Sequence, residues 1–530
     1  MANNDSVSLD TLFDALTQAD TFPHSCELIT TIETHISAVF LTGQFAYKVK
    51  KPVNFGFLNF TELDERRRFC LKELELNQRT APEIYLDVLA LERHDSGYRL
   101  VPLQQSHAAI EYVIQMNQFD PNDVLSKYLK REPFSNHLLE SLVNNIVKLH
   151  QSAEVVAPEL PWGTPEIVLK PMTDNFGCLQ GFEFPEQTLC SVEQIKQWTL
   201  AQAKSLAPIV TQRKQDGFVR ACHGDLHIDN IAVIAEQAVL FDGIEFNEQF
   251  RCIDVISDLA FLLVDLTYRG HAHKAMEILG LYLHQTQDYA ALQLLPYYMV
   301  YRAMVRAKIA VLRAQQCDSS SSEFIQKTKE AKAYIELACD LTLPKSAQLI
   351  LMQGASGSGK SFVANQLLEL LPAIVMSSDR TRKQLFQISA LTRVSEQDKS
   401  ELYSAQMNAK TYQALQDNAK LALSFGFHVI VDATFLKREH REHFYRLAKT
   451  LNIKASVVSL QPEPSWAERA IKARMHQDDN PSDATIEVMR QQLQYLEPPQ
   501  KDERAFVIHP DQPSRAWPET EIKDFLTQPI

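Results

Sequence analysis

Long apolar runs are missing from this chain. The longest, at residues 259–266, is broken by Asp265, whereas a membrane-spanning helix needs roughly 20 consecutive apolar residues. The first residues, MANNDSVSLDTLFDAL, contain neither the basic nor the apolar region of a secretory signal. We therefore expect a cytoplasmic protein that does not enter the membrane.

Paired cysteines and an excess of basic charge are missing as well. The eight cysteines are scattered singly, without a CxxC pair, a pattern typical of reduced thiols that disfavours a disulfide framework or a zinc site. Lysine and arginine number 53 against 66 aspartates and glutamates, for a formal net charge of −13. This balance argues against wholesale binding to nucleic acid or anionic membranes, although a local basic site stays possible.

What the chain does have is length and an ordinary globular composition. Its 530 residues are too many for one core and predict roughly two to four domains. Apolar residues make up 45% and charged residues 22%, which is typical of soluble globular proteins. Neither number predicts an oligomeric state.

The first half is organised around one polar segment, residues 222–258. It places the triplet HGD, ending in Asp225, shortly before Asn230, and Asp242 follows at the end of a second apolar run. Transfer of a phosphoryl group from ATP needs a carboxylate that orients the attacking hydroxyl and oxygen-bearing side chains that hold Mg²⁺. Asp225 fits the first role, and Asn230 and Asp242 fit the second. The alternative is a polar turn between two strands.

A lysine that binds phosphate is expected on an earlier hairpin. Two β-rich runs, 36–41 and 45–49, are joined through a Thr-Gly pair. Lys48, in the context FAYK, is close to the V-A-I-K pattern in which a kinase lysine holds the α- and β-phosphates. Lys50 shares the face of Lys48 by the period of two, so the choice between them stays open. The other interpretation is that these lysines are solvated charges at the end of a strand.

A strong helix is predicted at residues 62–79, before an Ala-Pro stop. Glu73 lies on the same face as Phe69 and Leu76, which predicts that its carboxylate points inward. An inward carboxylate needs a partner, and Lys48 is the obvious candidate. Alternatively, this is a surface helix on which Glu73 pairs with local arginine and lysine residues.

The remaining elements of the first half complete the pattern. Strands are expected at 84–91, 98–102 and 109–116, then a connection at 117–120 leading to a second lobe. Helices are expected at 138–150, 193–206, 256–268, 273–285 and 297–313, with an irregular, proline-rich stretch at 153–171. Asp258 either holds the catalytic loop as a structural acid or begins a solvated helix.

The motifs HGDLHIDN at 223–230 and FDGIE at 241–245 resemble the catalytic loop and the metal-binding segment of the aminoglycoside-phosphotransferase-like branch of the protein-kinase fold. The resemblance implies a bilobal, ATP-dependent small-molecule kinase. Two departures stand out. The half-chain has no G-x-G-x-x-G loop, only Gly43 in a tight hairpin, and residues 265–315 carry no recognisable acceptor signature. The acceptor therefore stays open.

A domain boundary is expected at QQCDSSSSE, residues 315–323, because a serine run cannot bury apolar surface. A charged helix at 324–341 follows. We expect domain limits of 1–316 for the kinase-like domain, 317–345 for the serine-rich linker and its helix, and 346–530 for a second nucleotide-binding domain.

The second half contains a G-x-x-x-x-G-K-S motif between a short apolar strand, 349–353, and an amphipathic helix. In this context the motif predicts a loop whose backbone N–H groups surround the phosphates, with Lys360 on the β- and γ-oxygens and the Ser361 hydroxyl on Mg²⁺. A merely flexible Gly/Ser loop fits the flanking strand and helix poorly. The motif comprises Gly354, Ala355, Ser356, Gly357, Ser358, Gly359, Lys360 and Ser361.

Acidic residues follow two later strands. Asp379 comes after the strand at 373–376 and is placed to accept a hydroxyl proton, with Arg382 on the same side of a starting helix. Alternatively, Asp379 only caps that helix. Asp432 ends the strand at 427–431 and is the candidate for the acid that supports the metal.

Arginines that close on the phosphates are sought after a fourth strand, at 456–460. Arg469 and Arg474 lie on a helix expected at 465–476 and are candidates for such a lid. For either one, an exposed helix arginine is the simpler interpretation.

GASGSGKS, the Asp379/Arg382 pair and VIVDAT resemble the P-loop small-molecule and polynucleotide kinase group, in which D-x-x-R contacts the acceptor. Taken together, the two halves resemble a bacterial family that fuses an aminoglycoside-phosphotransferase-like domain to a C-terminal P-loop, AAA-type ATP-binding domain. Segments such as IETHISAVFLTG and IVDATFLKREHR carry that likeness.

The expected fold is therefore a multidomain α/β protein with a kinase-like half and a parallel-sheet P-loop half. We expect two ATP/Mg²⁺ sites that transfer phosphate to a hydroxyl of a small molecule. An ATP-gated regulatory protein without transfer is one alternative. A nucleic-acid-end kinase is another, suggested by Arg380, Arg382 and Lys383 but disfavoured by the acidic charge.

Overall fold

The structure is a computed structural model of the chain. It describes residues 9–54, 56, 58–95, 97–344, 346–390, 392, 394–474, 485–510 and 518–528. Contacts divide the chain into two compact units, Met1–Asp174 with Leu200–Leu262, and Asn175–Thr199 with Leu263–Ile530. The expected domain limits, at 316 and 346, group the residues differently and remain a proposal.

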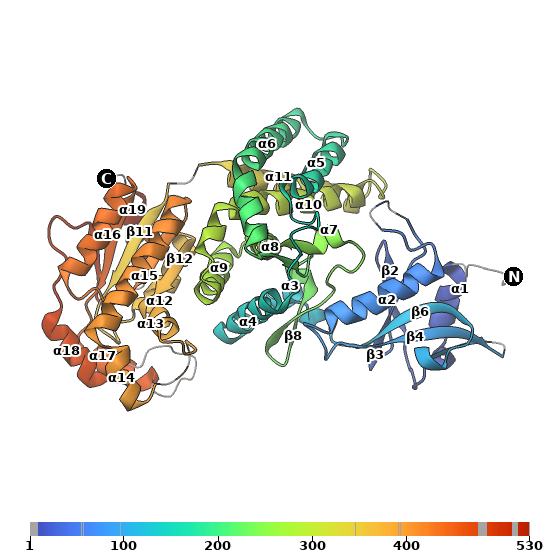
Figure 1. Cartoon of the computed structure of the whole chain (residues 1–530), viewed down its shortest axis with the longest axis horizontal. Helices are drawn as coiled ribbons and strands as arrows, with labels where there is room; N and C mark the ends of the chain where they lie inside the picture. The colour runs from blue at the N-terminus through green and yellow to red at the C-terminus, as the bar shows by residue number, and fades with distance from the viewer. Residues whose placement is uncertain are drawn as a thin grey trace. The chain divides into compact units, whose positions relative to one another are not determined.

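A six-stranded antiparallel sheet begins the first unit (Figure 1). Alternate residues of a strand face opposite sides, so Tyr47 and Val49 pack with helix α1 on one face, and Ala46 packs with helix α2 on the other. In spatial order the strands are β1 (Thr30–Glu33), β2 (Ser37–Leu41), β3 (Phe45–Lys50), β6 (Ala109–Asn117), β4 (Tyr85–His94) and β5 (Gly97–Pro102); the helices are α1 (Leu9–Leu16) and α2 (Leu63–Asn77).

A mainly helical part follows, with two small antiparallel sheets that hold the polar loops. Residues 222–230 connect β7 to β8, and residues 241–251 connect β9 to β10. This sequence of a β-rich part and a helical part is the order expected for the kinase-like half. The elements are α3 (Leu125–Tyr128), α4 (Asn136–Ser152), β7 (Val219–Ala221), β8 (Ile231–Ile234), β9 (Gln237–Leu240), α7 (Glu248–Arg251), β10 (Cys252–Asp254) and α8 (Val255–Tyr268).

Two helices depart from the sequence-based expectation. Helix α5 (Pro165–Gln180) includes Pro171, although residues 153–171 were expected to be irregular, and α6 (Glu186–Gln215) runs past both ends of 193–206 and includes Pro208. A proline removes one backbone hydrogen bond and strains its own turn. Tertiary packing compensates here, because Phe176, Leu179 and Ile195 are buried in one apolar cluster.

The second unit contains a helical pair around the serine run. Helices α10 (Leu295–Ala314) and α11 (Ser322–Thr342) share a buried cluster that includes Ala307 and Tyr334. The serine run forms the tight turn between them, because Ser321 Oγ accepts a hydrogen bond from Phe324 N at 3.0 Å and caps α11. Helix α9 (Ala272–Thr286) precedes the pair.

The rest of this unit is built on a five-stranded parallel sheet in the order β12-β13-β11-β14-β15. Its central strand is almost continuously buried, as a parallel sheet covered on both faces requires. The α/β fold class is therefore confirmed. The strands are β11 (Gln348–Gln353), β12 (Ala373–Ser377), β13 (His428–Asp432), β14 (Lys454–Leu460) and β15 (Ala505–Ile508). The helices are α12 (Lys360–Leu370), α13 (Ser378–Leu385), α14 (Glu396–Leu402), α15 (Ala405–Ser424), α16 (Arg438–Thr450), α17 (Pro464–Arg474), α18 (Ile486–Tyr495) and α19 (Glu519–Thr527).

No helix within the described ranges is both long and apolar enough to cross a membrane.

Candidate functional site

Lys48 of β3 reaches two carboxylates of the first unit. Its Nζ lies 2.7 Å from Glu73 Oε1 of helix α2 and 2.5 Å from Asp242 Oδ1, just after β9. Glu73 is fully buried, because its face of α2 packs against strands β4 and β6. The expected Lys48–Glu73 ion pair is present, and the alternative of a surface helix with local pairing does not describe Glu73.

Lys50, two residues further along β3, binds the same glutamate. Its Nζ lies 2.6 Å from Glu73 Oε2 and also pairs with Glu245. The two lysines therefore share Glu73 but differ in their second partner, since Lys48 alone reaches Asp242. Sequence reasoning missed Glu245, although it belongs to the FDGIE motif.

The charges of this cluster hold one another ionised. Burial would raise the pKa of Glu73, but Lys48 and Lys50 outweigh burial and lower it to about 2. Burial likewise opposes the charge on Lys48, yet Asp242 and Glu73 raise its pKa well above the ordinary value. Lys48 is thus a fixed cation at neutral pH.

Asp225 and Asn230 meet within the loop that joins β7 to β8. Asn230 Nδ2 donates to Asp225 Oδ2 at 2.9 Å and to Asp225 O at 3.0 Å. His227 Nε2 lies 3.3 Å from the same carboxylate oxygen and was not singled out from the sequence. The Asp225 side chain keeps about a third of its surface exposed, so a small molecule in solution is able to reach it.

Asp258 of helix α8 fixes the conformation of that loop. Its fully buried carboxylate accepts hydrogen bonds from His223 N at 3.0 Å and Gly224 N at 2.9 Å. Gly224 has φ +84°, and a Cβ there would lie 2.8 Å from Phe250 O, so only glycine fits. The interpretation of Asp258 as a structural acid is confirmed.

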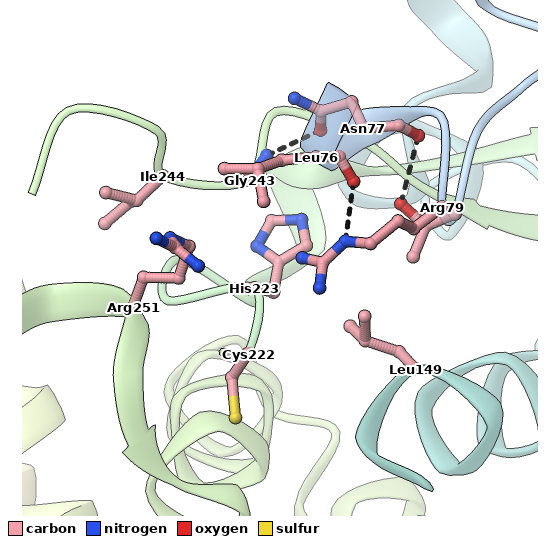
Figure 2. A pocket seen from close by; sticks show the side chains of 10 residues that line it. Leu76, Asn77, Arg79, Leu149, Cys222, His223, Gly243, Ile244 and Arg251 are labelled. Carbon is pink, nitrogen blue, oxygen red and sulfur yellow. Dashed lines mark hydrogen bonds between the residues drawn. The ribbon is translucent and has the colours of Figure 1, made fainter. Parts of the chain in front are cut away.

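The segment after β9 is held in place by helix α2. Phe241 N donates to Asn230 O at 3.0 Å. Gly243 N donates to Asn77 Oδ1 at 2.8 Å, as Figure 2 shows. Asp242, between them, adopts φ +63° and keeps 44% of its side chain exposed. Asn77 ends α2 only four residues after Glu73, so one helix positions both Lys48 and the Asp242 segment.

In the second unit, β11 runs into the glycine-rich loop and α12 begins at Lys360. Lys360 Nζ donates to Gly354 O at 2.9 Å and to Ala355 O at 3.0 Å, so the lysine folds back over its own loop. Ser361 Oγ donates to Asp432 Oδ2 at 2.7 Å. The two oxygen groups expected around Mg²⁺ are therefore neighbours, and hard oxygen donors of this kind fit that ion.

The loop allows no side chain at its closest approaches. Gly357 has φ +80°, and a Cβ would lie 2.8 Å from Ala467 O and 2.9 Å from the Ile471 side chain of α17. Ser356 N donates to Gln492 Oε1 of α18 at 2.7 Å. The motif does not predict the contact with Gln492, because this residue lies 136 positions away in the sequence.

Asp379 and Asp432 lie at the same edge of the parallel sheet as the loop. Asp432 is paired in register with Met352 on one side and with Ser377 on the other. The loop and Asp379 each begin two residues beyond these partners, at the carboxyl ends of the strands, where ligands of α/β sheets bind.

Arg382 lies beside Asp379 as expected, with Nη1 3.0 Å from Asp379 Oδ1. Its Nη2 donates to Asn408 Oδ1 at 3.0 Å, and its guanidinium lies 4.9 Å from the centre of the Tyr403 ring. Ser377 Oγ, not Asp379, accepts the capping bond of helix α13. The capping alternative for Asp379 is therefore wrong.

The two candidate lid arginines are not brought to this edge by any described contact. Arg469 is exposed on α17 and makes no ion pair within the described ranges. Arg474 ends α17, and its side chain lies outside the described residues.

A family model matches residues in the second half of the chain. Residues 349–499 match the AAA-domain family model. The phosphate-loop motif, Asp379 and Asp432 all lie inside the matched residues. Uncharacterised proteins of Mycobacterium bovis and Mycobacterium tuberculosis are each 28% identical over 416 residues, which is 78% of this chain and 80% of theirs.

Solved structures with similar parts include two kinases. A choline/ethanolamine kinase family protein from Mesorhizobium loti aligns with a TM-score of 0.39 and 13% identity, over 63% of this chain and 99% of its own. The APS kinase of Mycobacterium tuberculosis, in complex with AMPPNP and APS, aligns with a TM-score of 0.25 and 23% identity, over 35% of this chain and 100% of its own.

Proposed function

We propose that the chain is an ATP- and Mg²⁺-dependent phosphotransferase with two separate sites, one in residues 1–316 and one in 346–530, joined by 317–345. Each site transfers a γ-phosphoryl group to a hydroxyl of a small molecule. We also propose a cytoplasmic location, since all eight cysteines are free thiols.

The observation that carries the proposal is the 2.7 Å contact of Ser361 with Asp432 at the end of the glycine-rich loop. A hydroxyl and a carboxylate that meet beside such a loop suit Mg²⁺ bound to nucleotide phosphates. When bound, the metal neutralises charge that develops on those phosphates. Lys360 supplies a cation to their oxygens once it leaves Gly354 O and Ala355 O.

In this second site, Asp379 accepts the proton of the acceptor hydroxyl. Arg382, 3.0 Å away, holds the carboxylate in orientation. Arg474 closes over the phosphates from α17 in this proposal.

In the first site, Asp225 orients the acceptor hydroxyl, and Asn230 keeps the carboxylate in place through its 2.9 Å hydrogen bond. Asn230 and Asp242 offer amide and carboxylate oxygens, a donor set that suits Mg²⁺. Lys48, oriented by Glu73, contacts phosphate oxygens. Lys48 now lies 2.5 Å from Asp242. In the bound state, Lys48 would pair with the phosphate oxygens and Asp242 with the metal.

A labelled-ATP screen tests the proposal. Sugars, amino alcohols, aminoglycosides and 5′-hydroxyl oligonucleotides are incubated with the parent chain, with Asp225→Asn and with Lys360→Ala, and products are resolved by mass spectrometry. We expect each variant to lose a different product. If one variant keeps every product of the parent, its site is not a transfer site, and ATP binding without any product would support a regulatory role instead.

A further inference from the structure

A tryptophan side chain touches the glycine-rich loop of the second unit. Trp466 lies in the first turn of α17, and a Cβ built on Gly359 would lie 3.4 Å from its Cη2 and 3.9 Å from its Cζ3. Gly359 directly precedes Lys360 in the loop. The indole therefore packs against the backbone proposed to bind phosphate, yet Trp466 has no role in the transfer proposed above.

Helix α17 holds this indole in position beside the loop. A Cβ on Gly357 would lie 2.8 Å from Ala467 O and 2.9 Å from the Ile471 side chain. Ala467 and Ile471 are buried with Ala355 of the loop in one apolar cluster. The loop and the helix thus share a small core, and close packing of this kind fixes the place of Trp466 relative to the phosphate-binding backbone.

The order of the strands decides which end of a nucleotide would face Trp466. Strand β11, which leads into the loop, lies between β13 and β14. Asp432 ends β13 and Asp379 follows β12, so the residues proposed for the metal and the acceptor lie on one side of β11. The γ-phosphate must meet the acceptor. The base, at the opposite end of the nucleotide, would therefore extend towards β14, and α17 is the helix that follows β14 in the chain.

The contact with Gly359 agrees with this direction. In a loop of this kind the backbone N–H groups surround the α- and β-phosphates, whereas the lysine reaches the β- and γ-phosphates. The Cβ position on Gly359 that meets Trp466 also lies 3.8 Å from Leu460 Cδ2, at the end of β14. The indole is therefore on the β14 side of the loop, next to the backbone expected to hold the phosphate that carries the nucleoside.

The indole of Trp466 is able to make a further contact. The residue is only half-buried, so part of its ring is open to solvent. Among the described residues, none stacks a ring on this indole and none accepts a hydrogen bond from its N–H. A tryptophan ring combines a large apolar face with a polar N–H, and here both are offered beside the phosphate-binding loop.

We propose that Trp466 stacks on the base of the nucleotide bound in the second site. The inference rests on the function proposed above and adds the residue that binds the nucleoside part. Every base presents a π-face, so stacking on an aromatic side chain strengthens binding with little regard to which base is present. Trp466 would therefore favour nucleotides over bare polyphosphates without distinguishing ATP from GTP.

The test is isothermal titration of the full chain with Mg²⁺ and ATP, GTP or tripolyphosphate, which has no base. The binding event that Lys360→Ala abolishes belongs to the second site. For that event we expect Trp466→Leu to weaken ATP and GTP by about 5- to 150-fold and to leave tripolyphosphate unchanged. Trp466→Phe keeps a ring and should retain most of the ATP affinity. Trp198→Leu, the matched control, should keep all three affinities, because Trp198 packs against the cluster of α10 and α11.

An equal loss of ATP and tripolyphosphate in Trp466→Leu would overturn the inference, because the indole would then only support the loop. An unchanged ATP affinity would overturn it as well. If Trp466→Leu does not fold, indole fluorescence decides: ATP should alter the emission of the parent more than that of Trp466→Phe, and equal changes would contradict stacking. A parent without any Lys360-dependent binding would refute the proposed nucleotide site itself, whereas a parent that binds both ATP and tripolyphosphate there keeps that site even where the role of Trp466 fails.

Discussion

Glu73 is the residue on which two lysines of one strand converge. Replacing it by glutamine removes the carboxylate that Lys48 and Lys50 share and leaves each buried lysine with one carboxylate partner, Asp242 or Glu245. Breaking a buried pair in this way costs about 3–5 kcal/mol. We expect Glu73→Gln to lower the free energy of unfolding by that order in urea titrations. Glu75→Gln, on the exposed face of the same helix, should have little effect.

The same carboxylate predicts a pH dependence of stability. The pKa of Glu73 is lowered to about 2 in the folded chain, against about 4.3 in an unfolded one. Its contribution is therefore complete above the unfolded value and is lost as the pH falls through this window towards 2. Urea midpoints measured across that range should fall in the parent and fall less steeply in Glu73→Gln. Parallel curves for the two proteins would contradict the assignment.

Asp225 carries the prediction for activity. Asp225→Asn keeps an oxygen for Asn230 but loses the base, so we expect transfer at the first site to fall by about 10²–10⁴-fold with little change in Tm. Product formation from labelled ATP measures the loss. Asp216→Asn, an exposed acid hydrogen-bonded to Gln212, is the control. An equal loss in both variants would indicate a global defect.

At this scale the sequence predicts neighbours within one loop well and distant partners badly. Asp225 and Asn230 are five positions apart, so their hydrogen bond follows from a single turn. The period of a strand places Lys48 and Lys50 on one face, which left their roles open. Only the folded structure distinguishes the two lysines, because Glu245, the second carboxylate that pairs with Lys50, lies 195 positions away in the sequence.

At the scale of elements, the glycine-rich loop gives a steric prediction. Gly357→Ala places a Cβ in left-handed backbone, at about 1–2 kcal/mol, and against Ala467 O and Ile471, at about 1–3 kcal/mol more. Gly270 has φ +86° with nothing within 4 Å of a Cβ, so Gly270→Ala isolates the backbone cost. We expect only Gly357→Ala to weaken nucleotide binding, measured with a fluorescent ATP analogue. Equal affinities would argue against the loop as the nucleotide site.

The elements missed from the sequence share physical causes. The short edge strand β15 (Ala505–Ile508) is an apolar run of only four residues, AFVI, too short for its periodicity to identify a strand, and it is a strand here because it pairs with β14. Pro171 disfavours a helix in the sequence, but packing against the apolar cluster stabilises α5 in the folded chain. By contrast, β11 and α12 flank a motif with a unique spacing, and their positions were predicted within one or two residues.

For the whole molecule, the two proposed nucleotide sites predict two equivalents of bound nucleotide. Isothermal titration with AMP-PNP and Mg²⁺ should give a stoichiometry near two for the parent and near one for Lys360→Ala. Lys72→Ala, which removes only an exposed pair with Glu75, should behave as the parent. Removal of Mg²⁺ with a chelator should weaken both proposed sites, because each contains side-chain oxygens of the kind that suits the ion. A stoichiometry of one in the parent would contradict the two-site proposal.

The serine run shows what composition does not predict at this scale. A serine run has no apolar surface and therefore indicates a linker, yet Ser320 and Ser321 here make the hydrogen bonds that turn the chain from α10 into α11. Composition does not distinguish a flexible connection from a capped tight turn. The core shared by these helices, which includes Ala307 and Tyr334, decides between them.

The order of strands in the parallel sheet has a consequence for synthesis. Strand β14 needs β15 to cover its outer edge, but β15 emerges from the ribosome only after roughly 45 further residues, which takes about 2–9 s at ordinary translation rates. Throughout that interval the nascent chain exposes an unpaired β edge beside an almost complete sheet. Chaperones that shield such edges during translation would therefore act on this sheet in that interval.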